Sequence, residues 1–117
     1  MKLVDFPVKA SPGDSLNILV NIRNLSTTTW PALIRKAVKC SHHIYDCNGK
    51  ILLWDGARSN LPYDMSPNSE IALPLTIEAP SEPGRYRIAI DLVQEQVTWF
   101  SNKDVTMPSF EITSSDK

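Results

Sequence analysis

The sequence predicts an all-β fold: an immunoglobulin-like antiparallel β-sandwich of seven to eight strands. Apolar and polar residues alternate in residues 16–22, 38–44, 71–77 and 86–92, the period of strands that bury one face. Turn-forming residues separate these segments at intervals of roughly 8–12 residues, which is typical of two-sheet sandwiches. No segment shows the periodicity of a helix.

The N-terminal third is expected to supply two strands. Residues 3–8 are extended and contain Pro7, so we expect them at a sheet edge, where a missing N–H is harmless. Residues 16–22 form the second strand, after a turn at residues 11–14. A polar loop, residues 24–31, and an ambiguous segment at residues 33–36, compatible with one helical turn, follow it.

The middle of the chain contains a hairpin and a long connection. In the strand 38–44, Cys40 and His42 share one face, and Ser41 and His43 share the other. The Asn-Gly pair at residues 48–49 predicts a tight turn, with residues 50–54 returning as the next strand. Residues 55–67 are irregular, but their apolar side chains predict that they lie across the sandwich: Leu61, Tyr63 and Met65.

The last strands are expected to carry the main structural signature. Pro74 points outward from the strand 71–77, so this strand should lie near an edge. Pro83-Gly84 introduces the strand 86–92, and Tyr86 stands where a tyrosine corner of an immunoglobulin-like sandwich would place it. Residues 94–96 turn the chain, and residues 105–113 close the sandwich. The sequence thus predicts one domain, residues 1–113, with a flexible tail at 114–117.

Composition narrows the choice of partners and compartment. The 117 residues carry 12 basic and 13 acidic side chains, a net charge of -1, which argues against nucleic acid or an anionic membrane as partner. No apolar run reaches membrane-spanning length, and the N-terminus lacks the apolar core of a signal peptide. Cys40 and Cys47 are interpreted as free thiols, which fits a reducing compartment. We therefore expect a cytoplasmic location.

The sequence predicts no metal site and no cofactor. Cys40, His42, His43 and Cys47 are residue types that zinc prefers. However, His43 points away from Cys40 and His42 on a strand, and Cys47 falls in the turn. We therefore interpret these residues as structural.

No catalytic arrangement is expected either, so the chain is predicted not to be an enzyme. Ser41 and His42 are neighbours on a strand and face opposite ways, and there is no Gly-x-Ser-x-Gly motif. Carboxylate pairs could form among Asp55, Asp64, Asp91 and Glu95, but the sequence cannot bring two of them together.

The three tryptophans are the main candidates for binding. Trp30, Trp54 and Trp99 lie at strand ends or in loops. An exposed indole can stack on a sugar ring, whereas a buried one seals the end of a sandwich, and the sequence leaves both interpretations open. For Arg58, structural pairing with Asp55 is favoured over binding an acidic group. The predicted shallow polar-aromatic binding site consists of Trp54, Asp55, Arg58, Tyr63, Gln94, Glu95 and Trp99.

Four motifs stand out in the chain: Asn24-x-Ser26-x3-Trp30-Pro31, Tyr45-Asp46-x2-Gly49-x4-Trp54-Asp55-Gly56-x-Arg58-x2-Leu61-Pro62, Ala79-Pro80-x2-Pro83-Gly84-x-Tyr86 and Val93-Gln94-Glu95-x-Val97-x-Trp99-Phe100. Together they resemble an accessory domain of bacterial multidomain proteins that contain glycosyltransferase or methyltransferase domains. In outline the chain is also similar to the four-tryptophan domain of autophagy receptors. A looser likeness is to the carbohydrate-binding sandwich of polysaccharide-exporting ABC ATPases.

The resemblance implies a non-catalytic module of a surface-polysaccharide biosynthesis protein, which binds glycan or docks a partner domain. Two alternatives stay open: a protein-interaction module of the four-tryptophan type, and a structural spacer between catalytic domains.

Overall fold

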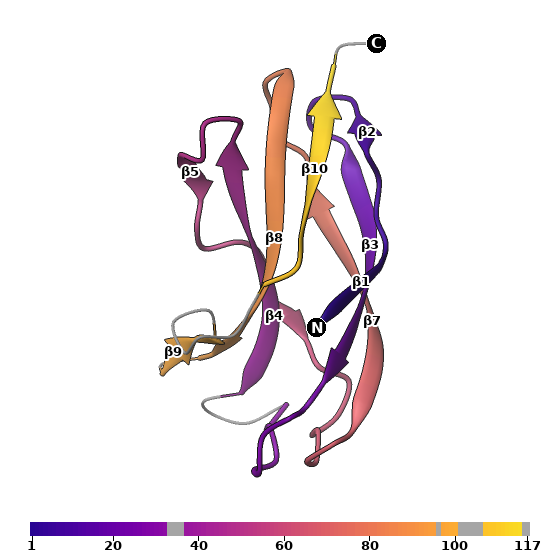
Figure 1. Ribbon diagram of the computed structural model, residues 1–117, viewed down its shortest axis with the longest axis vertical. Coiled ribbons are helices and arrows are strands. Elements are labelled where there is room, and N and C mark those ends of the chain that lie inside the picture. The colour runs from indigo at the N-terminus through magenta and orange to yellow at the C-terminus, as the bar shows by residue number, and fades with distance from the viewer. Residues whose placement is uncertain (33–36, 96, 101–106, 116–117) are drawn as a thin grey trace.

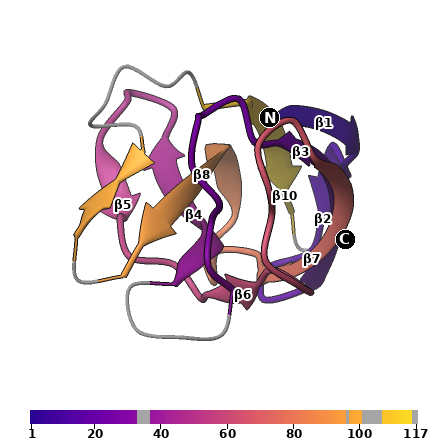
Figure 2. The same cartoon turned by 90° about the horizontal axis from the view of Figure 1, so that it is seen from below.

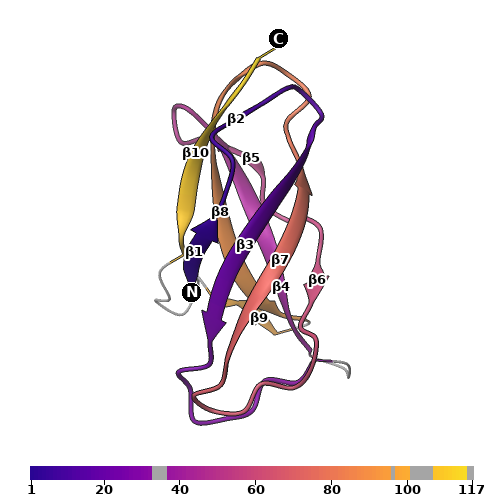
Figure 3. The same ribbon diagram turned by 90° about the vertical axis from the view of Figure 1, so that its right-hand side faces the viewer.

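Two β-sheets pack face to face in the computed structural model, which describes residues 1–32, 37–95, 97–100 and 107–115 (Figure 1). The smaller sheet has the order β1 (Lys2–Asp5), β3 (Ser15–Arg23), β7 (Glu70–Glu78). The larger sheet has the order β2 (Lys9–Ala10), β10 (Ser109–Ser114), β8 (Gly84–Gln94), β4 (Val38–Asp46), β5 (Ile51–Leu53). Two short strands extend it: β6 (Ser59–Asn60) pairs with β4, and β9 (Thr98–Trp99) pairs with β8. The fold is the expected immunoglobulin-like β-sandwich, and Figure 3 shows the smaller sheet lying over the larger one.

The N-terminal segment corrects one expectation. Residues 3–8 do not form a single edge strand, because β1 pairs with β3 and β2 pairs with β10, in the other sheet. Phe6 and Pro7 lie between the two strands, and Pro7 has no N–H to give to either ladder. The chain therefore changes sheets here, and the β2–β10 pairing is parallel in an otherwise antiparallel sandwich.

The described residues contain ten strands rather than seven or eight. The additional strands include β2, β6 and β9, each two residues long. Two residues are too few for alternation to be recognised in a sequence. Two of these short strands, β6 and β9, flank the candidate site described below.

The predicted core is confirmed. All twelve apolar side chains expected between the sheets are at most 9 % exposed. They alternate along three strands and face one another across the sandwich: Leu16, Ile18, Val20, Ile22, Ile71, Leu73, Leu75, Ile77, Tyr86, Ile88, Ile90 and Leu92. A register shift of one residue would turn a whole strand's apolar set outward, so this pattern fixes the pairing.

The connection from residue 55 to residue 67 lies across the sandwich as expected. Leu61 and Met65 are buried at 1 % and 0 % exposure, and Met65 exchanges two backbone hydrogen bonds with Trp30. Tyr63 differs from the expectation, since it is 54 % exposed. Trp30 is partly buried and packs against the core and against Phe100, with ring centroids 5.3 Å apart.

The remaining local expectations are largely confirmed. Pro74 lies on β7, an edge strand of the smaller sheet, and residues 46–49 form the hairpin turn with Gly49 at a φ of 85°. The closing strand β10 extends to Ser114, one residue past the predicted boundary. The ambiguous segment 33–36, as well as residues 105–106, lies outside the described residues. Within the described ranges, no helix has the length and apolarity needed to cross a membrane.

The tyrosine corner is also confirmed. Tyr86 buries its ring, and its hydroxyl donates a hydrogen bond to the backbone carbonyl of Glu82 over 2.7 Å. This bond holds the crossing between the sheets, residues 79–83, against the beginning of β8.

We expect Tyr86→Phe to lower the free energy of unfolding by about 1 kcal/mol, because the Glu82 carbonyl loses its hydrogen-bond donor. Urea denaturation checks this value. Arg85→Ala is a matched control on the same strand, since the Arg85 side chain is exposed. An unchanged denaturation midpoint for Tyr86→Phe would show that the corner contributes nothing.

Candidate functional site

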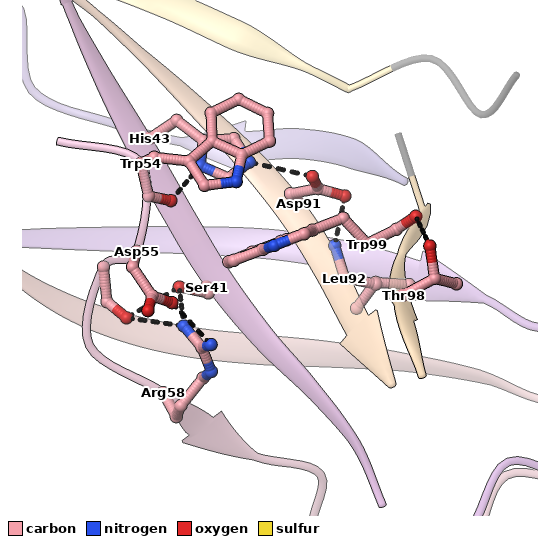
Figure 4. Close-up of polar contacts among 10 residues, drawn as sticks. Ser41, His43, Trp54, Asp55, Arg58, Asp91, Leu92, Thr98 and Trp99 are labelled. Carbon is pink, nitrogen blue, oxygen red and sulfur yellow. Dashed lines mark hydrogen bonds and ion pairs between the residues drawn. The ribbon is translucent and has the colours of Figure 1, made fainter. Parts of the chain in front are cut away.

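The face of β4 that points away from the core is buried, which is unexpected for the outside of a sandwich. Ser41 and His43 point outward and are 2 % and 0 % exposed. The segment that follows β5 and the short strand β9 fold over them. The result is a second, polar layer on the outer face of the larger sheet (Figure 4).

A buried pair, His43 and Asp91, forms the floor of this layer. The two residues come from the adjacent strands β4 and β8, and His43 Nε2 lies 2.8 Å from Asp91 Oδ2. Both side chains are completely buried. His43 Nδ1 donates to the backbone carbonyl of Trp54, because a carbonyl can only accept. Asp91 Oδ1 accepts the N–H of Leu92.

These partners determine where the protons lie. The Trp54 carbonyl requires a proton on His43 Nδ1, and a second proton must lie between Nε2 and the Asp91 carboxylate. His43 thus has no nitrogen available for substrate chemistry. The pair fixes the ring in place, in the way that the partner of a histidine usually does.

Two tryptophans cover the His43 ring. Trp54 stacks on it with centroids 3.7 Å apart and an interplanar angle of 9°, and Trp99 lies tilted against it at 4.6 Å. Trp54 and Trp99 also meet edge to face at 5.6 Å, a favoured aromatic geometry. Both indoles are half-buried, so part of each stays in contact with solvent.

Arg58 holds this layer to the sheet. Its Nε donates to Glu95 Oε1 at 2.7 Å, and its Nη2 pairs with Asp55 Oδ1 at 2.6 Å. Its Nη1 donates to Ser41 Oγ at 3.1 Å and to the Gly56 carbonyl at 2.8 Å. The favoured pairing of Arg58 with Asp55 is therefore present.

The electrostatics of Arg58 follow from the same contacts. Partial burial by itself would lower its pKa, but the hydrogen bonds and charges of Glu95 and Asp55 outweigh this effect and raise the pKa. The guanidinium also lies over the Trp99 ring, 4.8 Å from its centroid, an attractive cation–π geometry. Arg58 is a structural clamp here, and the exposed charges of the cluster are carboxylates.

The close approach of residue 56 to β4 requires the glycine of the Trp54-Asp55-Gly56 sequence. The Gly56 N–H donates to the His42 carbonyl at 3.2 Å, and a Cβ atom at Gly56 would lie 2.5 Å from that carbonyl oxygen. Only glycine lets the segment lie this close to β4.

The predicted site residues fall into two groups. Asp55, Arg58, Gln94, Glu95 and Trp99 line one shallow depression of about 290 Å³, and Trp54 contacts Trp99 beside it. Tyr63 is exposed, and no contact with this cluster is found in the described part of the chain.

His43 and Asp91 are not among the site residues predicted from the sequence. His43 was weighed only as a zinc ligand and Asp91 only as one of four carboxylates that could pair, and neither was expected to meet the other. They meet because β4 and β8 pair with Ser41 opposite Asp91 and His43 opposite Ala89. A charged residue at an outward position of a long apolar strand, facing an outward histidine, is the signal that could have suggested them.

The thiol of Cys40, buried on the inward face of β4, is not a ready nucleophile. Burial, followed by the charge of Asp91, raises the pKa of Cys40 to about 12, so the reactive thiolate is not formed near neutral pH. Cys40 and Cys47 are free thiols as expected. In the described ranges, no three metal-ligating side chains gather at one place.

The lowered pKa of His42 makes the stability of the fold depend on pH. Burial, with a smaller effect of His43, lowers this pKa from 6.5 to about 4. As the pH falls, His42 is therefore protonated in the unfolded chain before it is protonated in the folded chain. The stability that the neutral His42 contributes is complete above pH 6.5 and is lost as the pH falls toward about 4. We expect the stability difference between the protein and His42→Leu to change across this range in urea denaturation. Parallel pH curves for the two proteins would contradict the assignment.

Comparison with known proteins relates the chain to other sandwiches by fold. No protein-family model and no curated protein matches it. The crystal structure of the CARDB domain of a Pyrococcus furiosus protein, in complex with di-metal ions, is similar with a TM-score of 0.58 and 18% identity, covering 94% of this chain and 86% of that one. The solution structure of the same domain gives a TM-score of 0.58 and 18% identity over 97% and 91%.

A β-glucosidase from Listeria innocua, in complex with gluconolactone, contains a similar region. The TM-score is 0.61 at 14% identity, over 97% of this chain but only 15% of the β-glucosidase. At these identities the similarity shows the fold alone. These structures are neither glycosyltransferase accessory domains nor four-tryptophan domains, so those parts of the resemblance stay predictions.

Proposed function

We propose that this chain is a non-catalytic accessory module that binds glycan on the outer face of its larger sheet, within a bacterial surface-polysaccharide biosynthesis protein. The observation that carries the proposal is the cluster around Arg58. It combines the half-buried Trp54 and Trp99 with the carboxylates of Asp55 and Glu95 in one shallow depression.

The chemistry of this depression suits a neutral sugar. The CH groups of a pyranose ring pack on indole surfaces, and the hydroxyl groups donate to carboxylates. The Asp55 side chain is 72 % exposed and that of Glu95 34 %, so both have oxygen surface left for a ligand after pairing with Arg58. Gln94 adds an amide at the rim. Two carboxylates against one guanidinium leave the site net negative, which disfavours an anionic ligand.

The rigidity of the support also favours binding. The Trp54 and Trp99 rings rest on His43, which the Asp91 carboxylate and the Trp54 carbonyl hold in place. A binding surface that is already ordered loses little conformational freedom when the ligand arrives. Non-catalytic binding fits the same contacts, since both His43 nitrogens and the Ser41 hydroxyl are already engaged.

One observation favours a second candidate, docking of a partner protein. The edge strand β5 exposes all three of its side chains: Ile51 is 52 % exposed, Leu52 49 % and Leu53 37 %. An exposed apolar edge is a template on which an extended segment of another protein can add a strand. This surface does not include the Arg58 cluster, so the two candidates can be tested separately.

A glycan array probed with the 117-residue chain, followed by calorimetry on the best neutral ligand, tests the proposed function. Glu95→Gln keeps the size of the side chain and removes its charge, and we expect it to weaken binding about tenfold or more, as a lost charge-assisted hydrogen bond implies. Glu111→Gln is the matched control, because Glu111 is exposed on β10 and its one ion pair among the described residues is with Arg85, over 3.9 Å. Equal glycan affinity of the Glu95→Gln and Glu111→Gln variants would show that the glycan binds elsewhere. Leu52→Lys, on the edge strand β5, should weaken binding of a protein partner and leave glycan binding unchanged.

A further inference from the structure

A second pocket, of about 480 Å³, lies between the loop that follows β3 and the end of β8, and its volume is within the range of ligand-binding sites. Figure 2 shows these two segments from below. The pocket borders the Arg58 depression, because Gln94 and Thr98 line both.

The floor of this pocket is apolar and aromatic. Trp30 and Phe100 meet edge to face at 5.3 Å and line it together with the buried Leu92. Leu25 also lines the pocket but is 77 % exposed, so it does not belong to the floor. A ligand that fills it must therefore present an apolar face, such as the CH face of a sugar ring, to the indole.

The polar side chains that line the pocket define the rest of the ligand. They include Thr28 and Thr29 of the loop, together with Gln94, which can form hydrogen bonds with hydroxyl groups. The Thr98 hydroxyl already donates to the Trp99 carbonyl and can still accept a hydrogen bond. Within the described part of the chain, no aspartate or glutamate lines this pocket.

Arg23 supplies the charge. It lines the pocket at the end of β3, and its side chain takes part in none of the ion pairs between described residues. Glu70 lies directly opposite it in the strand register but forms no ion pair with it. An unpaired guanidinium beside an aromatic floor is suited to a carboxylate on the ligand.

We infer that this pocket, with Trp30 as its platform and Arg23 as its anion-binding group, binds a uronic acid, that is, a pyranose ring that carries a carboxylate. The inference rests on the proposed function and deepens it, because the two sites differ in charge. The carboxylates of Asp55 and Glu95 at the Arg58 depression repel an acidic sugar, whereas Arg23 attracts one. Together the two adjacent sites would bind a glycan that contains both neutral and acidic sugar residues.

The three tryptophans allow each site to be observed separately. In ¹⁵N-labelled protein the indole N–H of Trp30 reports on this pocket, and those of Trp54 and Trp99 report on the depression. Trigalacturonate is the probe, and we expect it to shift the Trp30 signal. Its fully methyl-esterified form is the matched neutral ligand, and we expect about tenfold weaker binding from it.

Arg23→Gln should weaken trigalacturonate binding about tenfold, whereas Arg85→Gln, at an exposed position away from the pocket, should not. Equal affinity for the acid and its ester, or an unmoved Trp30 signal, would overturn the inference. The proposed function would still stand if a neutral glycan shifted Trp54 and Trp99. If trigalacturonate shifted the Trp30 signal but no neutral glycan shifted the Trp54 and Trp99 signals, the proposed function would be wrong and the inference about the second pocket would stand.

Discussion

Asp91→Ala is expected to lower the free energy of unfolding by about 3–5 kcal/mol, because it leaves the buried His43 ring without its partner. The side chains of His43 and Asp91 are both 0 % exposed, so the lost partner is a buried one. Urea denaturation monitored by tryptophan fluorescence gives the value directly. The loss should also loosen Trp54, which stacks on His43.

Two control variants distinguish the loss of the His43–Asp91 contact from the general effect of removing a carboxylate from a strand. Glu111→Ala removes an exposed carboxylate whose contact with Arg85 is 3.9 Å long, and such surface pairs contribute about 1 kcal/mol or less. The double variant His43→Leu with Asp91→Leu leaves no unpaired buried charge, so it should lose less stability than Asp91→Ala. A change below about 1 kcal/mol for Asp91→Ala would show that the pair is not the support of the polar layer.

Ile88→Ala is expected to cost about 2–5 kcal/mol of stability, through lost transfer energy and the cavity left behind. Ile88 is 0 % exposed in the middle strand of the larger sheet, between Ile44 on β4 and Phe110 on β10. Chemical denaturation of the purified variant measures the loss.

Ile88→Val is the graded control for the cavity. It removes one methylene group and should cost about 0.5–1.5 kcal/mol. Similar values for the two variants would mean that the site collapses around the smaller side chain, contrary to the packing seen here.

The sandwich could be predicted because its strands each bury one face. In β3 and β7, alternation alone marks the inward residues, for example Ile18 and Leu75, which face the core together. The tyrosine corner was predictable for a related reason, since Pro83-Gly84 and Tyr86 are close in sequence and their geometry is local. The split of residues 3–8 between two sheets was not predictable, because a two-residue strand has no detectable period.

The site was only partly predictable, because it depends on contacts across the sheet. Trp54, Asp55 and Arg58 are neighbours in sequence. Glu95 reaches them through the β4–β8 pairing, and Trp99 through the β8–β9 pairing. The burial of His43 and Asp91 depends on the β4–β8 register and on the layer above, and one strand's pattern reveals neither. The sequence could propose the aromatic and charged groups, but not the buried pair beneath them.

The central claim is that Trp54 and Trp99 form a glycan-binding surface rather than a seal, and indole chemical shifts test it most directly. The neutral ligand selected on the array is titrated into ¹⁵N-labelled protein, with Trp54→Phe and Trp99→Phe used to assign the signals. The account predicts saturable shifts of the Trp54 and Trp99 indoles with one common dissociation constant, which Glu95→Gln raises about tenfold. Binding that leaves both indole signals unmoved would contradict it.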